Sequence, residues 1–225
     1  MYLSYCTKNK RFVAFTLAEV LMVLLVIGTV ASIVVPPIIN ETQDAELKTA
    51  WKKEFGILAN ATKLIVNDNG GSLVNVFSFN NNSGKHIVYF YKPYLNYLKF
   101  CTSSQLPGNC WHKADGSVKN IQGTPITNFV WYNFALILSD GTLIGFSGEY
   151  KDNCSTDRGL GAGNESCGFI IVDVNGFKKP NIYGRDIFLA VVTKNRLIPV
   201  TKNSSFIDGK CNTGGLGCSA QALYQ

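Results

Sequence analysis

The feature that most constrains the fold of this chain is a run of twenty uncharged residues near its start, from Val20 to Ile39. At about 1.5 Å per residue, a helix of this length can cross a hydrocarbon core of roughly 30 Å. Glu19 directly precedes the run. A charge in a lipid-bound segment costs on the order of 2.5 to 3.5 kcal/mol at the bilayer centre and indicates a function with a partner. The run therefore predicts a helix that does more than anchor the chain.

Length and charge limit the remaining possibilities. The 225 residues suffice for one domain with a core and an extension. Of the 21 basic residues, Lys8, Lys10 and Arg11 precede Phe15, and no acidic residue does. Positive charge before an apolar span keeps that end in the cytoplasm, so we expect the larger part of the chain on the other side of the membrane. The rest is only weakly basic, and nucleic acid is not expected as a partner.

Three interpretations of the apolar run compete. It could be an ordinary secretory signal, because Thr29-Val30-Ala31 offers a small residue for a cut after Ala31. It could also be a plain uncleaved anchor. Neither interpretation gives Glu19 a role.

The third interpretation comes from the residues around Glu19. The stretch Ala14-Phe15-Thr16-Leu17-Ala18-Glu19-Val20-Leu21 resembles the prepilin cleavage and methylation motif of type IV pilins and type II secretion pseudopilins. The resemblance implies a cut between Ala14 and Phe15, N-methylation of Phe15, and Glu19 as the fifth residue of the mature chain. Pro36 becomes the twenty-second, where the family usually has a helix-bending proline.

The chain departs from the family pattern at two positions. Ala14 stands where glycine is more frequent before the cut, and Ala18 where a larger aliphatic residue is common. Because alanine is also small, we still expect cleavage after Ala14.

The resemblance implies a function and a location. It implies a structural subunit of a type IV pilus or a type II secretion pseudopilus, and no enzyme. Its partners would be further copies or other pilin subunits, the prepilin peptidase and the inner-membrane assembly platform. The subunit would span the bacterial inner membrane once, with its head outside the cytoplasm, and then enter a pilus or a periplasmic or extracellular filament. The alternative is a secreted or membrane-anchored, disulfide-rich binding module with an ordinary signal sequence.

A physical role for Glu19 follows from a cut before Phe15. The cut leaves a cationic amine, and residues four apart face the same side of a helix. The Glu19 carboxylate can therefore neutralise that amine on its own chain or on a neighbour. In a bundle of such helices the pair would fix the axial register, because a misplaced copy leaves a charge unpaired in a dry core. The alternative is a glutamate that reaches out to the lipid headgroups.

The helix is expected to continue beyond the apolar run. We expect a leader at residues 1–14, a transmembrane or filament-core helix at 15–39, an amphipathic continuation at 40–70 and a globular head at 71–225. Pro36 and Pro37 should kink or locally melt the helix, and Asn67-Asp68-Asn69-Gly70-Gly71 should end it. The apolar positions of the continuation recur at spacings of three and four: Leu47, Ala50, Trp51, Ile57, Leu58, Ala61, Leu64 and Ile65.

The head should be rich in antiparallel strands, which makes the fold class α+β with the long helix packed on a sheet. Asp140-Gly141 predicts a hairpin with a two-residue turn between Phe134–Leu138 and Thr142–Phe146. The other expected strands are Ile87–Tyr91, which reads as a strand or a buried segment, Phe169–Val174, Ile187–Thr193 and Leu197–Val200.

Seven cysteines occur, and only Cys6 precedes the apolar run. A cut in or before the run leaves an even number, which suits disulfides in an oxidising compartment. The alternative is a metal site, but CxxC spacing and clustered histidines are both absent. The remaining cysteines form three pairs of near neighbours in the sequence, which favours three bridges that staple loops: Cys101–Cys110, Cys154–Cys167 and Cys211–Cys218.

Residues for catalysis are scarce. The only histidines are His86 and His112, and the sequence has no HExxH, GxSxG or Walker motif. We expect His112 to be a surface or packing residue.

Asp173, Asn175 and Asp186 offer hard oxygen ligands around a turn, as a calcium site requires. Some pseudopilins resemble this chain in carrying calcium near the end of the head. The alternative is that Asn175 only forms a turn and that Asp186 pairs with Lys178, Lys179 or Arg185.

Overall fold

A computed structural model describes residues 15–78, 85–127, 133–149, 152–160, 163–204 and 210–224. The expected leader, including Ala14, lies outside the described residues. The chain divides into two compact units, residues 1–43 and residues 44–225.

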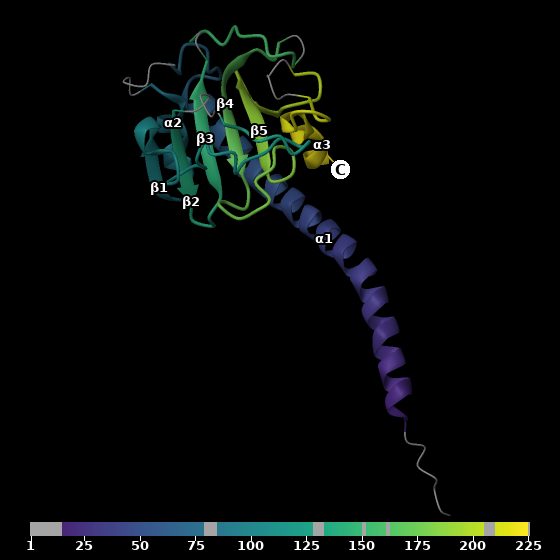
Figure 1. Ribbon diagram of the computed structural model, residues 1–225. Helices are drawn as coiled ribbons and strands as arrows, with labels where there is room; N and C mark the ends of the chain where they lie inside the picture. The colour runs from purple at the N-terminus through teal and green to yellow at the C-terminus, as the bar shows by residue number, and fades with distance from the viewer. Residues whose placement is uncertain are drawn as a thin grey trace, which may run out of the picture. The chain divides into compact units, whose positions relative to one another are not determined.

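Helix α1, Leu17–Asp68, begins in the first unit and ends in the second (Figure 1). In the first unit its large apolar side chains are exposed, for example Leu25, which is 69% exposed, and Ile33, at 75%. Two hydroxyls in this apolar stretch bond to the helix backbone: Thr29 Oγ1 donates to the Val26 carbonyl at 2.9 Å and Ser32 Oγ to the Thr29 carbonyl at 2.7 Å. The stretch therefore exposes an almost wholly apolar surface.

Helix α1 runs through Pro36 and Pro37 without a break. Of the two outcomes expected at these prolines, local melting does not occur, and a kink stays a prediction. Proline removes a hydrogen-bond donor, but its ring fixes φ near helical values, so the backbone path survives the lost donors. The helix ends as expected, because Gly70 and Gly71 adopt positive φ and the Gly71 N–H reaches the Val66 carbonyl at 2.8 Å.

The second unit contains a six-stranded antiparallel sheet in which each strand pairs with the next along the chain (Figure 1). The strands are β1 Tyr97–Thr102, β2 Phe134–Leu138, β3 Leu143–Gly148, β4 Ser166–Asp173, β5 Ile187–Thr193 and β6 Leu197–Pro199. The shorter helices are α2 Ile87–Tyr91, α3 Ser219–Tyr224 and the 3₁₀ turns η1 Lys92–Tyr94, η2 Ser103–Gln105 and η3 Leu216–Cys218.

The central strands of the sheet are buried on both faces. On one face α1 packs through a stripe that includes Trp51, Leu58 and Ile65 against sheet residues such as Ile170 and Phe188. Loops cover the other face with a second apolar cluster, and its members include Trp111, Phe169, Ile171, Tyr183, Leu189 and Leu216. Strands β3, β4 and β5 are therefore buried along their whole length. The head is α+β with the long helix on the sheet, as expected.

The amphipathic stripe of α1 is narrower than the sequence predicted. Ile57 and Leu64, which were expected on the buried face, are 36% and 48% exposed. Glu54 is instead almost fully buried, and its carboxylate binds Lys53 Nζ at 3.1 Å. Burial raises the pKa of Glu54.

Two local predictions in the head need correction. Ile87, Val88 and Tyr91 are buried, in line with a buried segment, but Tyr89 is 37% exposed. The segment forms helix α2 instead of a strand, because His86 Nδ1 accepts the Val88 N–H at 3.4 Å and caps the turn. The hairpin between β2 and β3 is present, but its loop has three residues. The Gly141 N–H bonds to the Leu138 carbonyl, and Gly141 has a φ of 93°, as a type I turn followed by a left-handed residue requires.

Three disulfides staple the second unit, and they are the three pairs favoured by sequence proximity: Cys101–Cys110, Cys154–Cys167 and Cys211–Cys218. The second of these joins the loop before β4 to β4 itself. Arg158 in that loop also makes a two-point ion pair with the buried Glu149, at 2.9 and 2.7 Å. The loop is therefore held at two points.

Candidate functional site

The first candidate site is the start of α1. The Glu19 carboxylate folds back over the helix end and accepts from the Thr16 N–H and the Thr16 hydroxyl, both at 2.8 Å. The Glu19 N–H donates to Thr16 Oγ1 at 3.2 Å. Thr16 and Glu19 thus form a capping box that starts the helix directly after Phe15. The sequence signal for this box is a threonine followed three residues later by a glutamate. The box was not predicted from the sequence.

The capping box has two consequences for the predicted cut. Phe15 precedes the helix and its ring is exposed, so the bond before it does not belong to α1. The Glu19 carboxylate also lies at the helix end, beside the residue whose amine a cut would create. The predicted pairing of Glu19 with that amine stays a prediction, and Thr16 already donates two hydrogen bonds to the same carboxylate.

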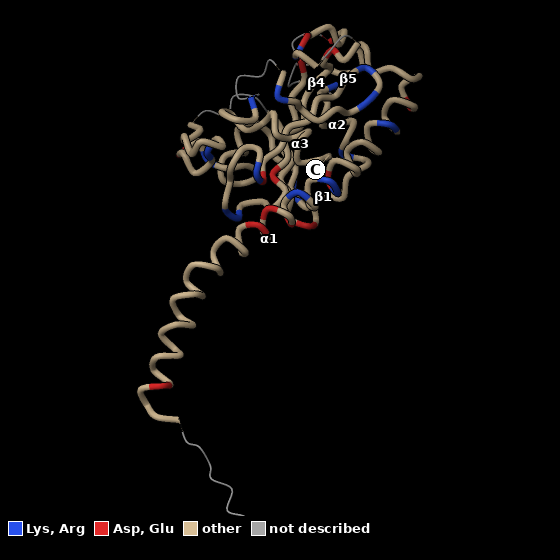
Figure 2. Tube along the Cα trace, turned by 90° about the vertical axis from the view of Figure 1, so that its right-hand side faces the viewer, with Lys and Arg blue, Asp and Glu red and all other residues tan. Residues whose placement is uncertain are grey.

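Within the described residues, α1 is the one helix that is long and apolar enough to cross a membrane. Figure 2 shows the long stretch without Lys, Arg, Asp or Glu that follows the acidic position near its start. A membrane anchor and a signal sequence share this property.

The second candidate site is the turn after β4, where a calcium site was predicted. The Asp173 carboxylate does not face solvent. Its Oδ2 lies 2.7 Å from His112 Nε2, and its Oδ1 accepts the Asn175 N–H at 3.2 Å. His112 is only 5% exposed, so it is a packing residue with a hydrogen-bond partner and not a surface residue. Its distance from Asp173 in the sequence explains why the pair could not be predicted.

Asp186 belongs to the same buried cluster. Its two oxygens accept the backbone N–H groups of Asn181 at 2.7 Å and Ile182 at 2.6 Å. Among the described residues it has no lysine or arginine partner, since Arg185 binds Asp44 instead. Burial raises the pKa of Asp173 to about 7, and the Asp186 charge adds to this. Burial likewise raises the pKa of Asp186.

The structure brings the three predicted ligands, Asp173, Asn175 and Asp186, to one turn. All four carboxylate oxygens already have a hydrogen-bond partner. Asn175 Oδ1 and Asn181 Oδ1 are buried without a hydrogen-bond partner among the described residues. No group of three or more His, Cys, Asp or Glu side chains in the described part of the chain is arranged to hold a metal. Calcium binding stays untested, and the hydrogen bonds to the carboxylates favour the alternative of a turn without calcium.

The calcium prediction can be tested by thermal unfolding. We expect the same unfolding temperature in millimolar calcium and in chelator, because the carboxylates are satisfied by protein donors. A rise of several degrees in calcium, lost in D173N, would instead assign the site to the cation.

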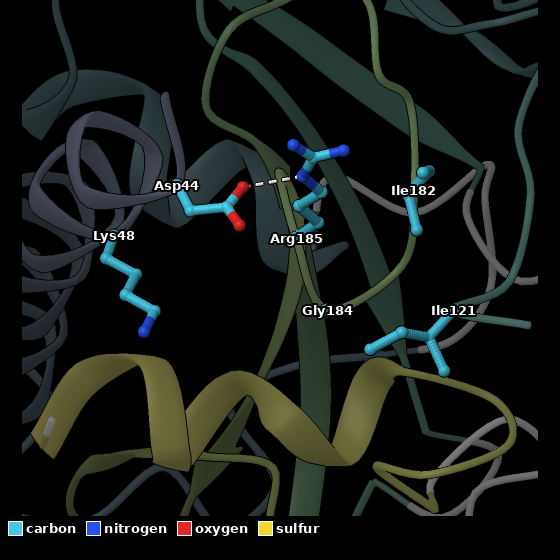
Figure 3. A pocket seen from close by; sticks show the side chains of 6 residues that line it. All are labelled: Asp44, Lys48, Ile121, Ile182, Gly184 and Arg185. Atoms are coloured by element: carbon cyan, nitrogen blue, oxygen red, sulfur yellow. Dashed lines mark hydrogen bonds and ion pairs between the residues drawn. The ribbon is translucent and has the colours of Figure 1, made fainter. Parts of the chain in front are cut away.

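The third candidate site is a hollow of about 350 Å³ in the second unit. Its lining combines α1 with the loops before β2 and β5, and Figure 3 shows Asp44 between Lys48 and Arg185, with Ile121 across the hollow from Lys48. Arg185 Nε donates to Asp44 Oδ1 at 2.6 Å. This site was not predicted from the sequence, because its residues lie far apart along the chain.

Comparison of the chain with family models, with curated proteins and with solved structures gave no match. A functional assignment therefore depends on the residues and geometry of the chain itself.

Proposed function

We propose that this chain is a subunit of a type IV pilus or of a type II secretion pseudopilus. The subunit is cut between Ala14 and Phe15 and polymerises through α1. The observation that carries this proposal is the position of the Phe15-to-Glu19 motif at the first turn of a single 52-residue helix. A cut there frees an amine beside a carboxylate at the end of the helix.

The two parts of α1 suit the two tasks of such a subunit. From Val20 to Ile39 the helix has exposed apolar side chains and no charge, which suits lipid before assembly and neighbouring helices afterwards. From Leu47 to Val66 the helix buries one stripe on the sheet. The antiparallel sheet with its disulfides then forms a head suited to an oxidising compartment.

The proposed partners and location follow from this assignment. The subunit spans the bacterial inner membrane once with its head outside the cytoplasm, and the prepilin peptidase and the assembly platform act on it there. The role is structural, and the pilin-like layout supports polymerisation without a catalytic centre.

Mass spectrometry of the mature amino terminus tests the proposal. The full-length gene is expressed in a host with a prepilin peptidase, and the expected product begins with N-methylated Phe15. A product that begins at Ser32 would overturn the proposal and favour the secreted, disulfide-rich binding module. The variant A14W serves as the control, because a bulky residue before the cut should leave the leader attached.

A further inference from the structure

The hollow next to Arg185 carries more positive than negative charge. Lys48 and Arg185 both line it, and among the described residues that line it Asp44 supplies the one carboxylate. Asp44 is bound to Arg185 Nε at 2.6 Å, whereas Lys48 forms no ion pair with any residue that the structure describes. A second carboxylate in the hollow would balance these charges.

The walls of the hollow are held in place before any ligand binds. The buried Asp186 fixes the loop in front of β5 by accepting the N–H groups of Asn181 and Ile182. Gly184 adopts a φ of 82°, and a side chain there would overlap the Gly215 carbonyl oxygen. Arg185 is therefore presented by a rigid backbone, which lowers the entropic cost of binding.

The charges on α1 indicate where a second carboxylate can come from. Glu41, Asp44 and Lys48 follow one another at spacings of three and four, so they share one face of the helix. Glu41 is exposed, and no described residue forms an ion pair with it. Glu41 and Lys48 lie two turns apart, about 10 Å along the axis.

Two parallel copies without an axial offset would place Glu41 beside Glu41 and Lys48 beside Lys48. The like charges would then repel each other. An axial offset of about 10 Å between the copies places Glu41 beside Lys48 instead. Glu46 is also acidic, but its spacing from Lys48 puts it on another side of the helix.

We infer that the hollow formed by Asp44, Lys48 and Arg185 binds the Glu41 carboxylate of a second copy of this chain. The contact sets an axial offset of about 10 Å between neighbouring copies. This inference rests on the proposed function, since parallel helices in a filament bring the two segments together. It adds a contact in the head region to the pairing at the start of α1.

Charge exchange tests the energetics of the contact in a host that assembles the filament. K48E and E41K should each lower the yield of sheared filament about tenfold or more, because like charges then meet. The double variant K48E/E41K should restore the yield to within about twofold, since the pair is only exchanged. K63E is the matched control: it makes the same charge change on the exposed side of the same helix, outside the hollow, and should leave the yield unchanged.

Cysteine cross-linking in membranes tests the contact independently of filament formation. All variants carry C6S, and an E41C chain is co-expressed with a K48C chain. A disulfide-linked dimer is expected, because neighbouring copies bring the two positions together. A bond within one chain is excluded, because cysteine Cα atoms about 10 Å apart cannot be bridged. E41C with K63C should give no dimer.

The outcomes separate the inference from the proposed function. Absence of the E41C–K48C dimer, or failure of the double charge variant to regain filament yield, overturns the contact even where Phe15 is N-methylated. A product that begins at Ser32 overturns the proposed function. It still contains positions 41 and 48, so the same cross-link, measured on the released product, still decides whether copies meet through the hollow.

Discussion

Trp51 joins three elements of the second unit. Its indole stacks on Phe188 of β5 with ring centroids 5.0 Å apart, and its Nε1 donates to the Ser219 carbonyl of α3 at 2.9 Å. The side chain is fully buried. The sequence predicted that Trp51 lies on the buried face of the helix, but not which strand or terminal helix it meets.

Two substitutions of Trp51 should separate the contribution of its packing to the free energy of unfolding from that of its hydrogen bond to Ser219. W51A should lower the free energy of unfolding by about 4 kcal/mol through the cavity it leaves. W51F keeps an aromatic ring but leaves the Ser219 carbonyl without its donor, and should cost about 2 kcal/mol. L64A, at an exposed position of the same helix, should change the free energy by less than about 0.5 kcal/mol. Urea denaturation measures the free energy of unfolding of all three variants. Equal losses of this free energy in W51A and L64A would contradict the buried position of Trp51.

The pH dependence of stability should depend in part on His86. Burial lowers the pKa of His86 from 6.5 to about 4. Because the folded pKa lies below the unfolded one, the stability contributed by neutral His86 is complete above pH 6.5 and is lost as the pH falls from 6.5 to 4. H86N keeps a side chain that can cap α2 but does not titrate.

The stability of the wild-type chain should therefore fall relative to H86N by about 3 kcal/mol between about pH 7 and about pH 4. Chemical denaturation of both chains at each pH measures the difference. Contributions from other titrating groups, such as Asp173, cancel in this comparison. If the free energy of unfolding changes with pH in the same way for the wild-type chain and for H86N, the imidazole of His86 is solvated in the folded state.

At the scale of elements, local sequence signals predicted some features well. The β2–β3 hairpin, strands β4 to β6 and the end of α1 all depend on neighbouring residues, such as Gly141 and the Gly70-Gly71 pair. Helix α2 and strand β1 do not show the pattern expected for their type. In β1, Leu98 is 73% exposed, so the strand lacks a clear alternation of buried apolar and exposed polar residues. Its pairing with β2 stabilises it instead.

Two turn glycines should differ sharply in their tolerance of alanine. Gly141 has a φ of 93° and open space where a methyl group would project, so G141A should cost about 1 kcal/mol of backbone strain. Gly184 has a φ of 82°, and a methyl group there meets the Gly215 carbonyl, so G184A should cost about 3 kcal/mol or more. The free energies of unfolding of the two variants provide the measurement. A similar cost at both sites would mean that the Gly184 loop can move away from Gly215.

At the scale of the whole molecule, the two units differ in what stabilises them. The buried apolar residues of the described chain start at Leu47 and belong to the second unit. The first unit exposes its apolar side chains and contributes none to the described core. The head should therefore fold without the apolar helix.

A fragment of residues 44–225 tests this separation. The fragment should be soluble and monomeric without detergent and should unfold cooperatively, because it retains the described core and all three disulfides. The full chain should sediment with membranes. Analytical ultracentrifugation and urea denaturation provide the readouts. A fragment that is unfolded or aggregated under oxidising conditions would show that the head needs the first unit.

The sequence by itself determined the features that depend on spacing along the chain. These include the long helix, its apolar first part, the strands from β2 to β6 and the pairs of near-neighbour cysteines. Each follows from a local period, a turn residue or a short loop that must close. The Phe15-to-Glu19 motif, on which the proposed function depends, is also such a local pattern.

Only the tertiary structure decided which distant residues meet. His112 reaches Asp173, and Asp44 reaches Arg185 across most of the chain. Such pairs leave no periodic signal in the sequence, because the sheet and the packed helix bring them together only after folding. The buried carboxylates and the charged hollow, and with them the inferred contact between copies, follow from that packing.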